Sequence, residues 1–160
     1  MAYITKSRQY QKIMSCILLY EKEGFISKEL IQIIQNSFSQ VDIKTVLGCE
    51  ECLAELRDST PDILMLGSNV ADCNGFDLIA QTRKMHPGVC IILVTDYNID
   101  EYRKDAILRG ASHIVSKELW TGNEMVALIK TILITKENQL HNKAEGSSIE
   151  IEDDTLKRFS

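Results

Sequence analysis

Polar side chains gather directly after an apolar run in the segment 61–75. Residues 63–66 are continuously apolar, which predicts a central parallel strand that is buried on both faces. In an open α/β sheet, ligands and reacting groups lie beyond the carboxyl ends of the strands. The residue at that end is Gly67, which has no side chain that could react. The polar residues that follow it are Ser68, Asn69, Asp72 and Asn74.

Three other segments of strand length also lead into charged or polar residues. Residues 13–20, 89–94 and 112–116 predict three more strands. Charged or polar residues follow each of these three segments. These residues are Glu21 and Lys22, Thr95 and Asp96, and Lys117.

Helices separate the predicted strands. Apolar residues recur at helical spacing between capping and breaking residues. The segment 41–47 alternates between apolar and polar residues, which predicts a half-exposed strand at the sheet edge. Five strands alternating with five helices predict an α/β fold with a doubly wound parallel sheet, flavodoxin-like, in strand order 2-1-3-4-5. The predicted helices cover residues 27–39, 49–58, 75–85, 100–109 and 123–137.

The composition limits the classes of partner. The chain has 160 residues and 44% hydrophobic content, which suits one domain with a core of its own. Its formal net charge of −5 and pI near 5.2 argue against direct binding to nucleic acid or to an anionic membrane, because such surfaces need clustered Lys and Arg. Neither an apolar run of membrane-spanning length nor a signal-peptide pattern is present, so we expect a cytoplasmic protein.

The same patterns predict three parts of the chain. Residues 1–11 show no clear periodicity and are expected to form an N-terminal arm. Residues 12–137 contain every predicted strand and helix and are expected to form the domain. Residues 138–160 are polar and acidic, which predicts a disordered tail.

Together these features resemble the receiver domain of two-component response regulators, over about residues 12–136. In that family, an Asp at the end of the third strand accepts a phosphoryl group from a histidine kinase. An acidic pair after the first strand, with a backbone carbonyl two residues past the acceptor, holds Mg²⁺. The resemblance rests on the acidic loop after the first strand, residues 61–66 leading into Asn69 and Asn74-Gly75, Met85-His86-Pro87, Thr95, Gly110-Ala111 and Lys117.

Matched position by position, the resemblance implies a phosphorylation site that has lost its chemistry. Gly67 stands at the acceptor position and offers no carboxylate. The acidic pair falls on Glu21 and Lys22, so an ammonium group replaces one Mg²⁺ ligand. We therefore expect a pseudo-receiver that is not an enzyme, works without Asp phosphorylation and needs no metal ion or other cofactor. The remaining positions fall on Asn69 for the carbonyl, and on Thr95 and Lys117 for the groups that contact the phosphoryl oxygens.

The resemblance also implies signal transduction or transcription control through protein contacts. Receivers commonly use the fourth helix, fifth strand and fifth helix for dimers and partners, so we expect a protein partner or a second copy on this face. The fourth helix, residues 100–109, has few apolar residues and is predicted to be the least firmly packed. The candidate contact residues are Tyr102, Leu108, Ile114 and Met125.

One alternative keeps a phosphate-type ligand at the site. Phosphate or a small anion would bind near Lys117 and Thr95. Asp96 or Asp72 would then act as a displaced acceptor, although in-line transfer depends on the position of the carboxylate and not only on its nearness.

A second alternative concerns the cysteines. The chain has five cysteines, an odd number, and is large enough to fold without disulfide bonds, so we expect reduced thiols. Cys49 and Cys52 form a Cys-x-x-Cys motif at a predicted helix start, which can be a thiol redox pair. Glu50 and Glu51 would raise the thiol pKa, so positions in the helix core and cap are the favoured interpretation.

Overall fold

The structure is a computed structural model that describes residues 15–21, 28–38, 40–68, 72–97 and 99–159. For residues 141 and 143–159 the description covers the backbone alone. The predicted arm over residues 1–11 lies outside these ranges. So do two residues of the predicted site, Lys22 and Asn69.

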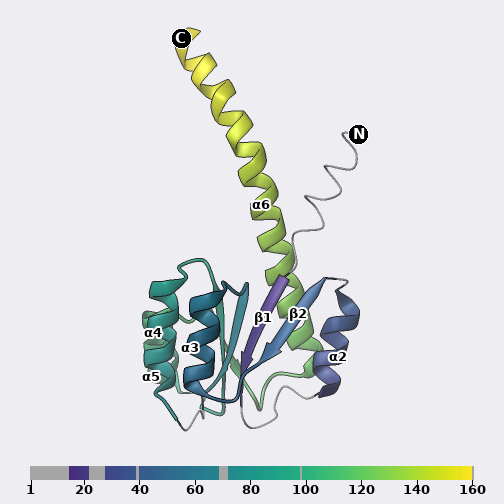
Figure 1. The fold of residues 1–160 in the computed structure, drawn as a ribbon, viewed down its shortest axis with the longest axis vertical. Coiled ribbons are helices and arrows are strands. Elements are labelled where there is room, and N and C mark those ends of the chain that lie inside the picture. The colour runs from purple at the N-terminus through teal and green to yellow at the C-terminus, as the bar shows by residue number, and fades with distance from the viewer. Residues whose placement is uncertain (1–14, 22–27, 39, 69–71, 98, 160) are drawn as a thin grey trace. The chain divides into compact units, whose positions relative to one another are not determined.

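Five parallel strands form one sheet in the order β2-β1-β3-β4-β5 (Figure 1), which confirms the predicted fold class and strand order. Every residue of β3 and β4 is buried, as expected for central strands with helices on both faces. The edge strand β2 has no buried residue, in agreement with its alternating sequence. The strands are β1 (Ser15–Tyr20), β2 (Val41–Thr45), β3 (Ile63–Gly67), β4 (Cys90–Thr95) and β5 (His113–Ser116).

Helices alternate with these strands along the chain. The side chains of α3, α4 and α5 pack in one hydrophobic cluster with alternate residues of the strands, such as Leu64 and Leu66 of β3. Successive strand side chains point to opposite faces, so Ile63 and Met65 are buried on the other side of the sheet. The helices are α2 (Lys28–Ser37), α3 (Cys49–Asp58), α4 (Gly75–Met85), α5 (Asp100–Arg109) and α6 (Gly122–Phe159).

Helix α5 has little apolar surface to bury. Ala106 is its single fully buried residue, while Ile107 and Leu108 are exposed. The sequence predicted this weak packing from the scarcity of apolar residues in the helix.

Helix α6 extends beyond the end predicted near Glu137. It runs to Phe159 and so covers most of the segment 138–160, for which we predicted disorder. That segment contains no Pro and is rich in residues that favour a helix, such as Glu, Lys and Leu. Residues 127–160 form a compact unit distinct from residues 1–126. Within the described ranges, no helix combines the length and the apolar character that a membrane span requires.

Arg83 ties the end of α4 to the turn that follows α5. Its guanidinium Nη1 donates to the carbonyls of Pro87 and Val89, at 2.7 Å each, and Nη2 donates to the carbonyl of Gly110 at 2.7 Å. Gly110 ends α5 with φ of 122°, in the left-handed region that favours glycine. A Cβ at Gly110 would lie 3.0 Å from both Cβ and Cγ of Arg83.

We predict that Gly110→Ala lowers the free energy of unfolding by about 1–3 kcal/mol. The Cβ of alanine is strained in the left-handed backbone conformation, and it crowds Arg83. Denaturant titration measures the loss of unfolding free energy, provided that its dependence on denaturant concentration, the m-value, is unchanged. Gly88→Ala is the matched control, since a Cβ there meets nothing within 4 Å. Equal stability of the two variants would contradict this account of the turn.

Candidate functional site

The carboxyl ends of β1, β3, β4 and β5 bring four predicted site residues to one edge of the sheet. Tyr20 pairs with Leu66 in the parallel register, so the residues that follow, Glu21 and Gly67, lie beside each other. Thr95 pairs with Ser116, which places Lys117 next to the end of β4.

Glu21 packs directly against the bare backbone of Gly67. A Cβ added to Gly67 would lie 2.9 Å from Cγ of Glu21 and 3.4 Å from its Cα, so the absence of a side chain makes room for Glu21. Glu21 is 8% exposed and is the one charged residue among the buried residues of the described chain. A buried carboxylate needs a compensating partner, because desolvation penalises its charge.

Lys117 supplies positive charge to this carboxylate. Its Nζ lies 3.9 Å from Oε1 of Glu21 and 3.9 Å from Oδ2 of Asp96. The side chains of Lys117 and Glu21 are 11% and 2% exposed, whereas that of Asp96 is 46% exposed. The ammonium group therefore lies between a buried carboxylate and a solvent-facing one.

Thr95 is held by the backbone around it. It is fully buried, and its Oγ1 accepts a hydrogen bond from the backbone N–H of Tyr97 at 2.9 Å. The backbone N–H of Lys117 donates to the Thr95 carbonyl at 2.9 Å. These bonds fix the end of β4 against the end of β5.

Tyr102 of α5 lies in an aromatic cluster next to this edge. Its ring centroid is 4.9 Å from that of Phe76 and 5.4 Å from that of Tyr97. Burial raises the pKa of its phenol, and the hydroxyl groups of Thr95 and Ser68 partly offset the rise. Tyr102 and Ser68 also line a cavity of about 170 Å³.

The structure corrects part of the predicted contact face. Ile114 is 7% exposed and packs in the core cluster, since its position in β5 points toward the helices. Met125 is fully buried, near the start of α6. Leu108 is 84% exposed and is the residue of the four that a partner could contact freely.

Asp72 is engaged away from Lys117 and Asp96. Its Oδ1 accepts the phenol hydroxyl of Tyr20, and its Oδ2 accepts the backbone N–H of Cys49 at 2.7 Å. The carboxylate therefore caps the N-terminus of α3, where the exposed backbone N–H groups favour an acceptor.

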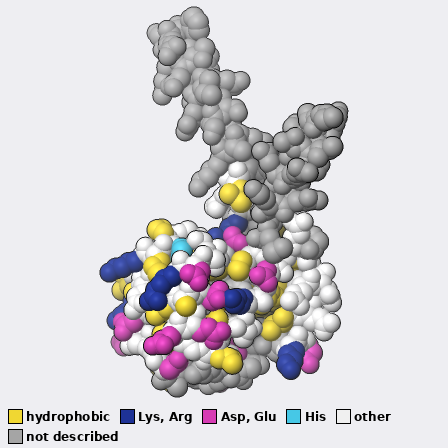
Figure 2. Space-filling view, viewed as in Figure 1, with side chains coloured by type: hydrophobic (Ala, Val, Ile, Leu, Met, Phe, Trp, Pro, Cys, Tyr) yellow, Lys and Arg dark blue, Asp and Glu magenta, His cyan; other side chains and the backbone are white. Residues whose placement is uncertain are grey.

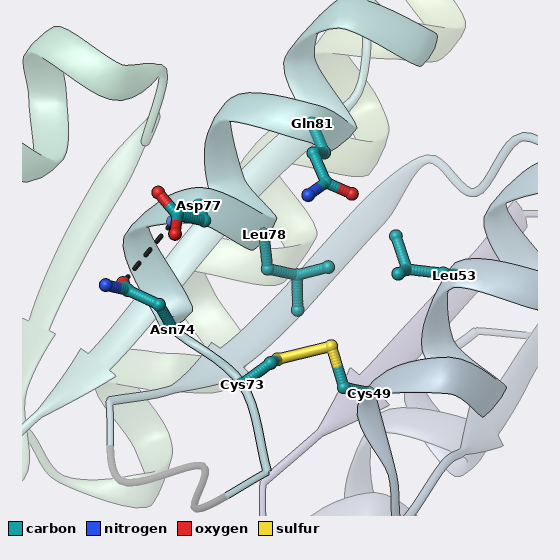
Figure 3. A pocket seen from close by; sticks show the side chains of 7 residues that line it. All are labelled: Cys49, Leu53, Cys73, Asn74, Asp77, Leu78 and Gln81. Atoms are coloured by element: carbon teal, nitrogen blue, oxygen red, sulfur yellow. Dashed lines mark hydrogen bonds between the residues drawn. A yellow bond between two sulfur atoms is a disulfide. The ribbon is translucent and has the colours of Figure 1, made fainter.

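The cysteines confirm one sequence-based interpretation and contradict another. Cys49 and Cys52 lie at the start and in the buried face of α3, as favoured for the Cys-x-x-Cys motif. Cys49 forms a disulfide with Cys73, across a Cα–Cα distance of 6.0 Å, so the expectation of five reduced thiols was wrong (Figure 3). Cys52 is not its partner: it is fully buried, and burial followed by the charges of Glu51 and Glu55 raises its pKa to about 12. Sequence spacing drew attention to Cys49 and Cys52, whereas the disulfide joins the first residue of α3 to Cys73, 24 residues away in the loop before α4.

Comparison with known proteins identifies the family to which this fold belongs. The model of the family described as "Response regulator receiver domain" matches residues 17–130, well over half of the chain. The chain belongs to this receiver domain family. It is similar to the DNA-binding transcriptional activator DevR/DosR of Mycobacterium tuberculosis, with 32% identity over 117 residues. That match covers 72% of this chain and 53% of the relative.

The chain is also similar to a second curated protein and to solved structures. The sensory transduction protein LytT of Bacillus cereus is 27% identical over 139 residues, 85% of this chain and 55% of LytT. This receiver domain thus spans about half the length of the two curated relatives named. Among solved structures, a CheY-like receiver from Methanospirillum hungatei has a TM-score of 0.68 at 21% identity and covers 79% of this chain and 98% of its own. An orphan response regulator of H. pylori has a TM-score of 0.64 at 18% identity. The match covers 74% of this chain and 96% of the H. pylori chain.

We predict that Lys117→Met lowers the free energy of unfolding by about 1–3 kcal/mol, because it leaves the buried Glu21 carboxylate without the adjacent cation. Glu21→Gln removes the charge and is expected to cost less. The double variant is expected to lose less than the sum of the two, by at least about 0.5 kcal/mol.

Denaturant unfolding of the four proteins in this cycle measures the coupling. The exposed Lys84→Met serves as the control for the loss of a lysine and is expected to change stability little. Strictly additive effects of the Lys117 and Glu21 substitutions would show that the pair does not interact.

Proposed function

We propose that this receiver domain signals through protein contacts, without phosphorylation of an aspartate, and is not an enzyme. The observation that carries the proposal is the packing of Glu21 against Gly67, where the family has its acceptor. Gly67 provides no nucleophile for an acyl phosphate. The space that a carboxylate would use is next to the Glu21 side chain, which is already paired with Lys117.

The family's Mg²⁺ does not suit this donor set. Mg²⁺ takes oxygen ligands in near-octahedral geometry, usually including one or two carboxylates. Of the three positions where the family has carboxylates, Glu21 alone keeps one. The Nζ atom of Lys117 lies 3.9 Å from Oε1 of Glu21. Gly67 supplies no side-chain oxygen. We therefore derive no step that uses a metal ion or another cofactor.

A second candidate function is phosphate acceptance at Asp96. Its carboxylate is half exposed and lies 3.9 Å from the Lys117 ammonium, which would attract a phosphoryl group. Asp72, the other displaced carboxylate we considered, is less suited because Tyr20 and the backbone of Cys49 already donate to it.

We predict no covalent phosphorylation when the chain is incubated with Mg²⁺ and acetyl phosphate, because no carboxylate stands at the acceptor position. Intact-mass spectrometry measures the addition of one phosphoryl group, and a receiver domain that is labelled under the same conditions is the positive control. Labelling that disappears in Asp96→Asn would favour the second candidate. Labelling that persists in that variant would overturn both.

The proposed contact surface is the exposed side of α5, and the proposed occupant is a second copy of the chain. Leu108 and Ile107 are 84% and 58% exposed, so apolar side chains face solvent on this helix. Acidic residues begin α5 and basic residues lie further along it, including Glu101 and Lys104. Two antiparallel copies about a two-fold axis would bring the acidic first turn of each α5 toward the basic last turn of the other copy.

Nucleic acid and membranes are not part of the proposal. The net charge is −5, and on the face that Figure 2 shows, Lys and Arg side chains are interspersed with Asp and Glu. Mixed charge suits contact with another protein better than contact with a polyanion.

We predict that Leu108→Glu abolishes self-association of the chain, because it places a charge at the centre of the apolar contact. Sedimentation analysis over a range of protein concentrations measures the monomer–dimer equilibrium, with an expected weakening of at least tenfold. Leu47→Glu, at another exposed leucine of 68% exposure, is the matched control and should leave the equilibrium unchanged. A wild-type chain that is monomeric at every concentration would contradict the choice of occupant.

A further inference from the structure

The Cys49–Cys73 disulfide joins the starts of two neighbouring helices. Cys49 is the first residue of α3, and Cys73 directly precedes Asn74, the N-cap of α4. Asn74 Oδ1 accepts the backbone N–H of Phe76 at 2.9 Å. The bond therefore connects the helix before β3 to the loop between β3 and α4.

Neither of the two disulfide-bonded residues is fully buried. Cys49 and Cys73 are partly exposed and line a cavity of about 150 Å³. Figure 3 shows the disulfide at one end of this cavity, with Leu53 of α3 and Leu78 of α4 on its walls. Thiol–disulfide exchange requires that a thiolate approach one of the two sulfurs, so access is the first condition for it.

The remaining thiols are poorly placed to compete for this bond. Cys52 and Cys90 are buried, and burial raises the pKa of the Cys52 thiol to about 12. Burial also raises the pKa of Cys16, which lies in β1. A raised pKa lowers the thiolate fraction and with it the rate of attack.

We infer that Cys49 and Cys73 form a thiol-exchange site that takes a small thiol or disulfide of the glutathione class and switches the covalent link between α3 and the loop before α4. This inference does not rest on the proposed function, because it concerns other residues and another chemistry.

The small thiol or disulfide supplies or accepts all the electrons and protons of the exchange. In the oxidising direction, the Cys49 thiolate attacks one sulfur of the small disulfide, forms a mixed disulfide and releases one small thiolate. The Cys73 thiolate then attacks the Cys49 sulfur and releases the second. The two S–H protons of the protein pass to the two released thiolates, and two electrons pass to the small disulfide.

Non-covalent contacts keep the loop in place after reduction. The carboxylate of Asp72 still accepts from Tyr20 and from the backbone of Cys49, and Asn74 still caps α4. Reduction is therefore expected to loosen the connection between α3 and α4 without unfolding the domain. The melting temperature should fall by roughly 5–10 °C, as for the loss of a disulfide that closes a loop of this length.

The test is equilibration of the full chain in buffers of graded reduced-to-oxidised glutathione ratio. After acid quenching, unfolding and alkylation, intact-mass spectrometry counts free thiols. We expect a single step from three alkylated cysteines to all five, since two of the five form the bond. The amide resonances of Cys49 and Asn74 should shift over the same range of ratios.

Variants decide whether the step belongs to this pair. Cys49→Ser and Cys73→Ser should each abolish the two-thiol step, and Cys16→Ser is the matched control that should keep it. If Cys49→Ser disturbs α3, Cys73→Ser gives the same test from the loop. The inference is overturned by a thiol count that stays constant at every ratio. It is equally overturned if peptide mapping links Cys49 to Cys52, or if the step survives in Cys73→Ser.

Discussion

The buried carboxylate of Glu21 determines what the carboxyl edge of the sheet can do. A carboxylate in this position needs space and a compensating charge, because desolvation penalises it. Gly67 gives the space, since any Cβ there would meet Glu21, and Lys117 gives the charge. The backbone N–H of Lys117 is in turn bonded to the carbonyl of Thr95. The contacts of this side chain thus link the ends of β1, β3, β4 and β5.

Two contrasting regions lie next to this edge. On one side, α5 buries little apolar surface and presents Leu108 to solvent, which suits an element that exchanges partners. On the other, the disulfide between Cys49 and Cys73 and the bonds of Asp72 hold the starts of α3 and α4 together. A receiver domain built in this way has a fixed side and a loosely packed side. We propose that signals reach it through contacts or thiol chemistry rather than through phosphate.

Much of the fold could be predicted from sequence because its strands are marked by local pattern. The continuous apolar run before Gly67 indicates a strand that is buried on both faces. The alternation within 41–47 indicates a strand with one face toward solvent. The candidate residues Glu21, Thr95 and Lys117 followed from the resemblance to receiver domains. Their burial and the 3.9 Å separation of Lys117 from Glu21 did not, because these depend on side-chain packing across the sheet.

Two of the errors came from features that depend on residues far apart in the chain. A local Cys-x-x-Cys motif drew attention to Cys52, but the loop after β3 carries Cys73 to Cys49. Ile114 and Met125 were assigned to the contact surface because receivers commonly use these elements for partners. Both side chains are buried in the core. The length of α6 was underestimated because an acidic composition was read as disorder, although the same residues favour a helix.

The central claim is that the edge occupied by Glu21 and Gly67 does not respond to a phosphoryl group. A ¹H–¹⁵N NMR titration with Mg²⁺ and then beryllofluoride, which mimics that group, tests it most directly. The account predicts that the amide resonances of Glu21, Gly67, Thr95 and Lys117 stay where they are. Concerted shifts of these resonances together with those of α5 would contradict it, because they would reveal a ligand-driven switch at this edge.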